Sequence, residues 1–273
     1  MSKSERFAQD GYLIEKAVFT TAEIEAIKEE AAQLCHREIG GESAEAAMRT
    51  ALAIHFPHKL SPLIHRTLSH PGIVRVLTEV VSPNVKAMQS MMFFKHAGKP
   101  GQAWHQDEFF IPTRDRSLIG AWIALDPATI DNGCLWILPG SNKPGILWPM
   151  RAHGDAEFDS SPMAYGYPED VPAVPAEAAP GDVVFFNGYT LHRSLRNRQT
   201  EGFRRALVHH YMSAESWLPW DCGGQIQPTR DNRDVVLVAG ADPYADTGLQ
   251  DHHRSYVRAE EAMRSEVSHS LRA

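Results

Sequence analysis

A series of short runs rich in β-branched and aromatic residues, from Val85 to Ser213, limits the folds that this chain can adopt. Glycine, proline, asparagine and aspartate separate the runs, for example at residues 98–101, 131–133 and 180–182, as expected of turns. Because no helical pattern intervenes, the runs predict a mainly β fold, an antiparallel sandwich or jelly roll. The runs read VKAMQSMMFFK, QAWHQDEFF, LIGAWIAL, CLWIL, DVVFFN and RRALVHHYMS.

Two helices precede this region and are expected to pack on one of its sheets. The first begins at Thr20 and Glu23, which have capping-box spacing, and continues through TTAEIEAIKEEAAQLCH. The second follows Pro71 in GIVRVLTEVV and ends before Ser82. Residues 37–60 match no pattern and stay unassigned. The apolar face of the first helix consists of Ile24, Ile27, Ala31 and Leu34.

The length of 273 residues fits a single catalytic domain, because β barrels and sandwiches of roughly 200–250 residues often form one unit. We expect a helical part over 1–84, a β core over 85–213 and an irregular C-terminal extension over 214–273. Residues 143–180 are rich in proline and lack periodicity, which is typical of an insertion that lines or covers a site. The extension is expected to end in a surface helix around Ser255 to Glu266.

The charge and the cysteines exclude several classes of function. Lys and Arg number 27 against 34 Asp and Glu, so a formal charge of -7 disfavours binding to nucleic acid or anionic membranes and favours a small-molecule substrate. Three widely spaced cysteines, with no CxxC pair, indicate neither a disulfide framework nor a zinc site, and they predict a cytoplasmic location. The sequence contains no apolar stretch long enough for a membrane span.

His105 and Asp107 are the first candidate metal ligands. They lie two residues apart in AWHQDEFF, which reads as a strand, so their side chains are expected to point to the same face. A lone His-x-Asp pair is weak evidence in a chain with 14 histidines. A third ligand is therefore needed to support a site.

His192 is the candidate for that third ligand, because it follows the apolar run DVVFFNGYTL. The alternative is a histidine of the core or of a loop. Two histidines and one carboxylate leave three positions of a metal open, which suits a non-haem Fe(II) oxygenase that must bind both a chelating cosubstrate and O2.

Arg204, at the start of RRALVHHYMS, is the candidate anion-binding residue. A turn through residues 196–199 is expected to return it antiparallel beside the strand of His192. Its guanidinium can donate two parallel hydrogen bonds to the far carboxylate of a dicarboxylate. Arg205 should face the opposite way, as a surface residue.

Several of these motifs together resemble the phytanoyl-CoA dioxygenase family over most of residues 7–212. They are GQAWHQDEFF, NGCLWILPGSNK, PGDVVFFNGYTLHRS and EGFRRA, in the family order and at similar spacing. The resemblance implies a double-stranded β-helix, Fe(II), O2 and the cosubstrate 2-oxoglutarate, with ascorbate as a supporting reductant. It also implies oxidative decarboxylation of the cosubstrate coupled to oxidation of a small molecule.

The resemblance assigns a role to individual residues. His105, Asp107 and His192 match the iron ligands. Arg204 and Ser194 match residues that bind the C5 carboxylate of 2-oxoglutarate. The matches that remain are to positions contacting the cosubstrate: Met91 and Trp122, which by sequence alone read equally well as core residues, and Arg49, where the surrounding similarity is low.

The chain departs from the family pattern at Asn142, which replaces a histidine that does not bind iron. Related halogenases carry a small Gly or Ala where this chain has Asp107, so the resemblance implies hydroxylation and not chlorination. Residues 55–59, HFPHK, either face the substrate or form a solvated turn. Two rival functions remain: a non-catalytic jelly-roll binding protein, and a cupin-like metalloenzyme that does not use 2-oxoglutarate, for which Arg204 would have no purpose.

Overall fold

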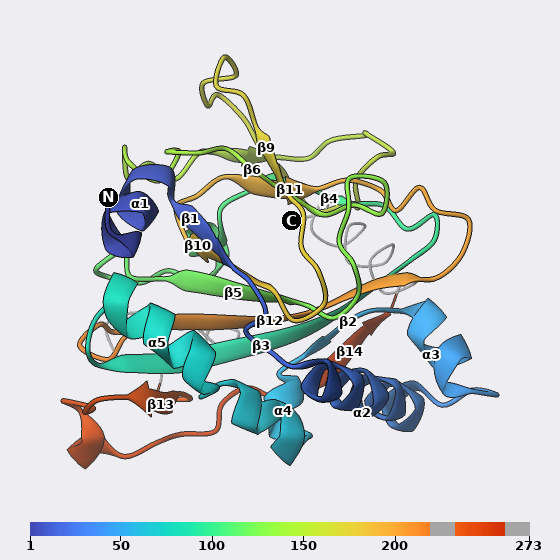
Figure 1. The fold of residues 1–273 in the computed structure, drawn as a ribbon, viewed down its shortest axis with the longest axis horizontal. Coiled ribbons are helices and arrows are strands. Elements are labelled where there is room, and N and C mark those ends of the chain that lie inside the picture. Colours follow the sequence, from blue (N-terminus) through green and yellow to red (C-terminus); the bar gives the residue numbers. More distant parts are fainter. Residues whose placement is uncertain (219–232, 260–273) are drawn as a thin grey trace, which may run out of the picture.

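Two antiparallel sheets face each other in the computed structural model, which describes residues 1–218 and 233–259 (Figure 1). The larger sheet has the order β1-β10-β5-β12-β3-β2-β14, with β13 also paired to β3, and the smaller has the order β4-β11-β6-β9. A β7-β8 hairpin lies in the insertion. This arrangement confirms the predicted jelly roll. The strands are β1 (Tyr12–Glu15), β2 (Ala51–His55), β3 (Val85–His96), β4 (Gln102–His105), β5 (Ile119–Ala124), β6 (Leu135–Ile137), β7 (Met150–Arg151), β8 (Met163–Ala164), β9 (Val174–Ala176), β10 (Val183–Asn187), β11 (His192–Ser194), β12 (Phe203–Ser213), β13 (Val236–Ala239) and β14 (Tyr256–Ala259).

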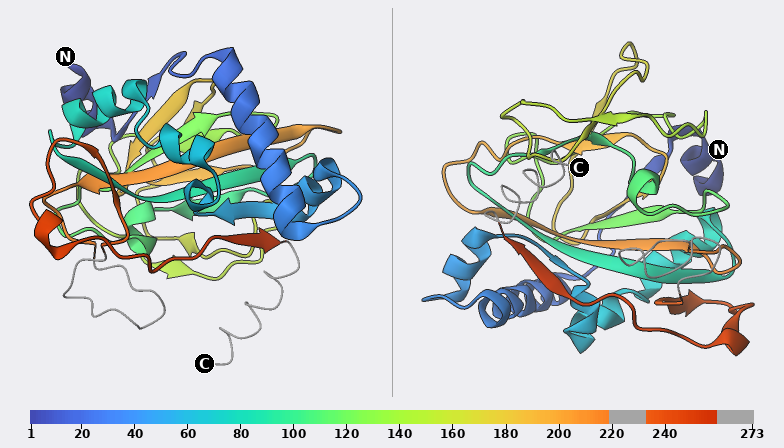
Figure 2. Two further views of the ribbon diagram at one scale, coloured as in Figure 1. Left: turned by 90° about the horizontal axis from the view of Figure 1, so that it is seen from below. Right: turned by 180° about the vertical axis from the view of Figure 1, so that it is seen from behind.

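The helices gather mainly on the outer face of the larger sheet, where α2, α4 and α5 lie across its strands (Figures 1 and 2). The α2 helix begins with the predicted capping box of Thr20 and Glu23, and α5 spans the second predicted helix. No helix in the described ranges is both long and apolar enough to cross a bilayer. The helical segments are α1 (Lys3–Asp10), α2 (Thr21–Ile39), α3 (Ala44–Thr50), η1 (Pro57–Lys59), α4 (Pro62–Thr67), α5 (Pro71–Val80), α6 (Asp107–Phe110) and η2 (Ala245–Thr247).

Alternation along the strands of the larger sheet divides the protein into two apolar layers. On β12, Leu207 and Tyr211 pack outward with the helices, whereas Ala206 and Val208 face the smaller sheet. Side chains at positions i and i+2 of a strand share a face, so this register fixes which residues can reach the space between the sheets. The even-numbered residues of β12, which include Arg204, therefore face inward.

The expected boundaries of the β core differ from the observed ones. The N-terminal part, expected to be helical, contributes β1 and β2 to the larger sheet, and the C-terminal extension contributes β13 and β14. The expected surface helix is wrong over Tyr256–Ala259, because this segment pairs with β2 as an edge strand. The rest of that expected helix, residues 260–266, lies outside the described residues.

Candidate metal and cosubstrate site

Two histidines on neighbouring strands of the smaller sheet form the base of the site. His105, the last residue of β4, lies directly opposite His192, the first residue of β11, and their ring centroids are 4.1 Å apart. Each Nδ1 lies close to a main-chain carbonyl two residues earlier, at 2.8 Å for His105 and 3.0 Å for His192. When each Nδ1 donates its hydrogen to that carbonyl, each Nε2 keeps a lone pair for a metal ion.

Asp107 reaches the same point by a route that differs from the prediction. The strand ends at His105, and Asp107 is the first residue of helix α6. Gln106 between them is still extended, with φ -126° and ψ 128°, so the two side chains converge as they would on one strand. Asp107 Oδ1 lies 3.6 Å from the Nε2 atom of His105 and 3.6 Å from that of His192.

The protonation of these side chains suits a cation. Burial, followed by the nearby His192, lowers the pKa of His105 to about 4, so that its ring is neutral near pH 7. Burial by itself would raise the pKa of Asp107, but His192 and a hydrogen bond from His210 hold this pKa well below its usual range. One donor atom from each of the three residues lies within 4.8 Å of the others, a spacing that fits a single metal ion.

His210 is a residue of the site that the sequence analysis did not single out. It lies on β12 and is 4% exposed, and its Nε2 is 3.0 Å from Asp107 Oδ2. The sequence did contain a signal for this residue. Adjacent strand residues face opposite ways, so one histidine of the His209-His210 pair has to face inward. His209 points outward to Thr67 Oγ1, at 2.8 Å, while His210 shares the inner face with Arg204.

Arg204 occupies the opposite sheet from the one expected. Its strand, β12, pairs with β3 and β5, whereas the strand of His192 pairs with β4 and β6, so the turn after β11 crosses between the sheets. Arg205 faces outward as predicted, but it is not the expected surface residue: its side chain is only 16% exposed and forms an ion pair with Asp126 at 2.8 Å. Both directions follow from the alternation along β12.

The Arg204 side chain is buried without a polar partner among the described residues. It is 4% exposed, its Nε atom has no hydrogen bond, and its guanidinium lies 5.3 Å from the centre of the Trp122 ring. Burial lowers its pKa to about 10, so the group is still charged at neutral pH. A buried charge without a partner is costly, which makes this position suited to a bound anion such as a carboxylate.

Lys95 and Ser194 complete the polar group around Arg204. Lys95 is the cross-strand neighbour of Arg204, and its Nζ donates to Ser194 Oγ at 2.8 Å and to the Leu195 carbonyl at 2.7 Å. Ser194 Oγ also accepts a bond from the Gln102 amide at 3.3 Å, so its hydroxyl hydrogen is available to a ligand. Burial and the charge of Arg204 lower the pKa of Lys95 well below its usual value.

A cavity of about 520 Å³ joins the three metal-ligand candidates to Arg204 and Ser194. Met91 and Trp122 both line it, Trp122 being 4% exposed. The insertion also contributes to the wall, through Asp159, Ser161 and Pro162. The structure therefore brings together all of the predicted site residues except one.

That exception is Arg49, which the structure does not bring to the cavity. It lies in the last turn of α3, forms an exposed ion pair with Glu45 at 2.7 Å and sits over the Phe203 ring at 5.4 Å. Strand β2 follows helix α3 directly. Arg49 belongs to the helix and therefore lies outside the sheet that lines the cavity. The predicted contact of Arg49 with the cosubstrate has no support in this geometry.

The structure also shows where Asn142 and residues 55–59 lie. Asn142 lies away from the cavity, where its Nδ2 donates to the Ala8 carbonyl at 3.2 Å. Residues 55–59 are divided: His55 lines the cavity, whereas His58 points elsewhere and contacts Ser90 Oγ at 2.6 Å. The left-handed backbone of Phe56, with φ 54°, separates these two directions.

The family model and the most similar known proteins agree on one family for this chain. Residues 7–206 match the family model described as phytanoyl-CoA dioxygenase (PhyH). Phytanoyl-CoA dioxygenase 1 of Oryza sativa subsp. japonica is 34% identical over 163 residues, which is 59% of this chain and 57% of the rice protein. The peroxisomal phytanoyl-CoA dioxygenase of Rattus norvegicus is 29% identical over 231 residues, covering 77% of this chain and 67% of the rat protein. The chain thus spans less than two thirds of the rice relative.

Solved structures share the fold at lower sequence identity. The non-haem α-ketoglutarate-dependent epimerase SnoN from nogalamycin biosynthesis superposes with a TM-score of 0.68 at 20% identity. The alignment covers 88% of this chain and 96% of SnoN. This likeness concerns the arrangement of the sheets and adds nothing about the substrate.

Proposed function

This chain belongs to the phytanoyl-CoA dioxygenase family, and we propose that it is an Fe(II)- and 2-oxoglutarate-dependent dioxygenase that hydroxylates a small molecule. The observation that carries the proposal is one cavity holding both a His-Asp-His cluster and a buried arginine that has no polar partner among the residues described. A metal site alone would suit many functions. The arginine adds a place for the second carboxylate of a chelating dicarboxylate.

The proposed iron ligands are His105, Asp107 and His192. When bound, Fe(II) and 2-oxoglutarate activate O2 for oxidation of a C–H bond, with release of succinate and CO2. Asp107 would offer its Oδ1 to the metal while its Oδ2 accepts the hydrogen bond from His210, which fixes the carboxylate in one rotamer. Three protein ligands would leave room at the metal for the cosubstrate and oxygen.

The proposed binding site for the C5 carboxylate of 2-oxoglutarate is Arg204 with Ser194. The guanidinium donates two parallel hydrogen bonds and the Ser194 hydroxyl donates a third. Lys95 holds Ser194 Oγ at 2.8 Å and so orients that hydroxyl. Trp122 lies 5.3 Å from the guanidinium and restricts its movement, and Met91 lines the adjacent wall.

The residues that line the cavity determine which hydrogen of the substrate is oxidised. The cavity has apolar surfaces, including Phe93, Phe110 and Ile111, which limit access of water to the reacting carbon. Hydroxylation is the proposed outcome, although desaturation, ring closure or epimerisation can follow from the same hydrogen abstraction.

We also propose a cytoplasmic location. Cys35 and Cys134 are buried free thiols, which is in keeping with it.

The test begins with iron-loaded protein kept free of oxygen. Addition of 2-oxoglutarate should produce the weak visible charge-transfer band of a bidentate chelate. Exposure to air, with ascorbate present, should then form succinate. A jelly-roll binding protein would show neither result, and a cupin-like metalloenzyme would bind the metal without the band, so either pattern would refute the proposal.

A further inference from the structure

The cavity has more positive charge than the iron and the cosubstrate account for. Among the residues that the structure describes, five lysine and arginine side chains line it against two aspartates, although the whole chain has a formal charge of -7. Fe(II) and the dianion of 2-oxoglutarate cancel each other, so the excess persists when both are bound. The five basic side chains are Lys95, Lys99, Arg193, Arg204 and Arg258, and the two acidic ones are Asp107 and Asp159.

One of these basic side chains has no partner in the described part of the chain and no task in the proposed reaction. Lys95 is bound to Ser194, and Arg193 lies over the Trp104 ring at 4.6 Å. Arg258 has neither a side-chain hydrogen bond nor an ion pair within the described residues, and its Nε atom is buried. Leaving a guanidinium nitrogen unpaired in a cavity costs free energy unless a ligand pairs with it.

The register of β14 directs Arg258 into the cavity. Tyr256 pairs with His55 and Arg258 pairs with Ala53, so both share the inner face. Val257 between them packs outward against the helical side of the sheet. Ala53, opposite Arg258, has only a methyl side chain and offers the guanidinium no polar partner.

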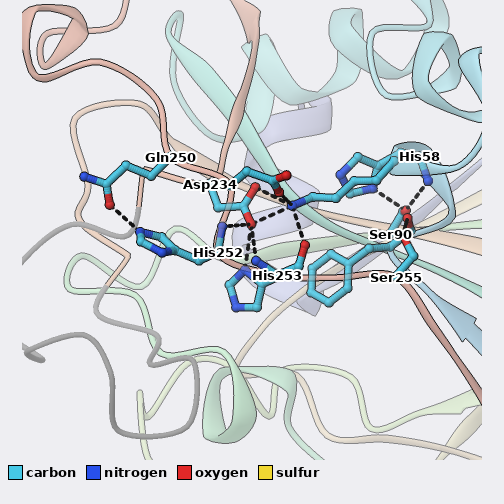
Figure 3. A network of polar contacts seen from close by, with 10 residues as sticks. His58, Ser90, Asp234, Gln250, His252, His253 and Ser255 are labelled. Carbon is cyan, nitrogen blue, oxygen red and sulfur yellow. Dashed lines mark hydrogen bonds and ion pairs between the residues drawn. The ribbon is translucent and has the colours of Figure 1, made fainter.

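A polar network fixes the segment that carries Arg258 (Figure 3). Asp234 accepts hydrogen bonds from the His253 amide at 2.8 Å and from Lys59 Nζ, at 2.8 Å through Oδ1 and 2.7 Å through Oδ2. Ser255 Oγ donates to the Phe56 carbonyl at 2.8 Å. The segment from Asp234 to Arg258 is therefore tied to the end of β2, which holds β14 in register over the cavity.

His55, on the strand paired with that of Arg258, adds no charge to the cavity wall. Burial, followed by the charges of Arg258 and His210, lowers the pKa of His55 to about 3, so this histidine is neutral near pH 7. Its ring stacks on Tyr256, with centroids 4.4 Å apart, and its Nε2 has no hydrogen bond. A neutral imidazole and a phenol ring suit the uncharged body of a ligand.

We propose that the primary substrate carries an anionic group, a carboxylate or a phosphate ester, and that Arg258 binds this group. This inference rests on the proposed function. Three strand spacings, about 14 Å, separate β14 from β12, the strand of Arg204. Arg258 and Arg204 therefore bind different anionic groups, and the uncharged body of the substrate lies between Arg258 and the proposed metal site.

The experiment uses the whole chain loaded with Fe(II) and 2-oxoglutarate, without oxygen. Calorimetric titrations compare hexanoate, decanoate and phenyl phosphate with hexanamide, decanamide and phenol. Wild type should bind at least one of the anions and bind its neutral counterpart at least about tenfold more weakly. Arg258→Gln should weaken that anion about tenfold to a hundredfold, and Arg258→Lys should restore part of the affinity.

The matched control is Arg254→Gln, which removes the same charge from an exposed position on the same segment. Affinity for 2-oxoglutarate and basal succinate formation should be unchanged in all of these variants, because none of them alters the proposed cosubstrate site. Equal binding of anions and neutral counterparts, no binding of any anion, or an Arg258→Gln protein as good as wild type would overturn the inference. A wild type that neither binds 2-oxoglutarate nor forms succinate would instead refute the proposed function, and the inference with it.

Discussion

His210 Nε2 lies 3.0 Å from Asp107 Oδ2, while Asp107 Oδ1 lies 3.6 Å from each of the two facing histidines. One oxygen of the carboxylate is therefore held by the larger sheet and the other is directed at the ligands of the smaller sheet. This contact joins the two layers of the jelly roll at the proposed metal site. A carboxylate held in this way binds a metal with less loss of rotamer freedom.

We predict that His210→Ala lowers Fe(II) affinity about tenfold to a hundredfold, because Asp107 loses its orienting hydrogen bond. His210→Gln, which can still donate to Oδ2, should restore part of that affinity. The matched control is His209→Ala, which removes a contact with Thr67 on the outer face and should reduce stability without changing iron affinity. Metal titration under nitrogen measures all three, and equal iron affinity in wild type and His210→Ala would contradict the role of His210.

Arg204→Lys should weaken 2-oxoglutarate more than it weakens iron. Loss of one of two charge-assisted hydrogen bonds costs about 1.5–3 kcal/mol, which is about tenfold to a hundredfold in affinity. Arg205→Lys is the control, because Arg205 pairs with Asp126 on the opposite face. Titration of the charge-transfer band gives both affinities, and unchanged 2-oxoglutarate affinity in Arg204→Lys would mean that another residue binds the C5 carboxylate.

Asp107→Ala should nearly abolish succinate formation while circular dichroism stays close to that of wild type. The variant loses the anionic iron ligand, but the fold depends on the two apolar layers and not on a structural metal. In wild type the carboxylate occupies the place that a small Gly or Ala leaves to chloride in related halogenases, so the product should be hydroxylated and not chlorinated. Near-normal turnover in a folded Asp107→Ala protein would show that the metal site lies elsewhere.

Acidification should destabilise the iron-free protein between about pH 6.5 and pH 4. Burial, as the largest cause, lowers the pKa of His55 to about 3 and that of His58 to about 4, from an ordinary value near 6.5. Below pH 6.5 the unfolded chain binds protons that the folded chain excludes, so the free energy of unfolding falls as pH falls. Each histidine contributes up to about 1.4 kcal/mol per pH unit in this window.

Urea unfolding measured across this pH range tests whether the free energy of unfolding falls on acidification and whether His55 contributes to the fall. His55→Phe, which keeps a ring against Tyr256, should flatten the pH dependence by close to one proton. A stability that rises on acidification, or a slope that His55→Phe leaves unchanged, would contradict the assignment.

Lys59→Met should release the C-terminal segment. The substitution removes a cationic partner from Asp234, which is largely buried, and should cost about 3 kcal/mol. Hydrogen exchange should accelerate in residues 250–259 and less in the core strands β5 and β10. Arg49→Met is the control, since its exposed pair with Glu45 contributes under about 0.5 kcal/mol. Unchanged exchange in residues 250–259 would show that Lys59 does not hold the segment.

Local patterns in the sequence were enough to predict two of the helices, α2 and α5, and most of the core strands. The capping box at Thr20 and the alternation in RRALVHHYMS are properties of neighbouring residues, and both are found in the structure. The His105 and Asp107 side chains converge even though Asp107 begins a helix, because the backbone of Gln106 is extended in either case.

Features that depend on distant pairing could not be predicted in this way. The pairing of Tyr256 with His55 joins segments about two hundred residues apart, and the sequence of neither segment specifies the other. Lys95 is a similar example, since its bond to Ser194 spans 99 residues. The expected position of Arg204 beside His192 was wrong because a turn of ordinary length can cross between two facing sheets as readily as it can return within one.

The β14 strand also has a consequence for the behaviour of the chain in concentrated solution. It covers the free edge of β2, whose sequence ALAIH is apolar and would otherwise present unpaired main-chain groups to other molecules. The strand that takes over the edge is short and bears an arginine, and both properties discourage a further strand from adding to the sheet. The same C-terminal segment that completes the cavity therefore also protects the protein against edge-to-edge aggregation.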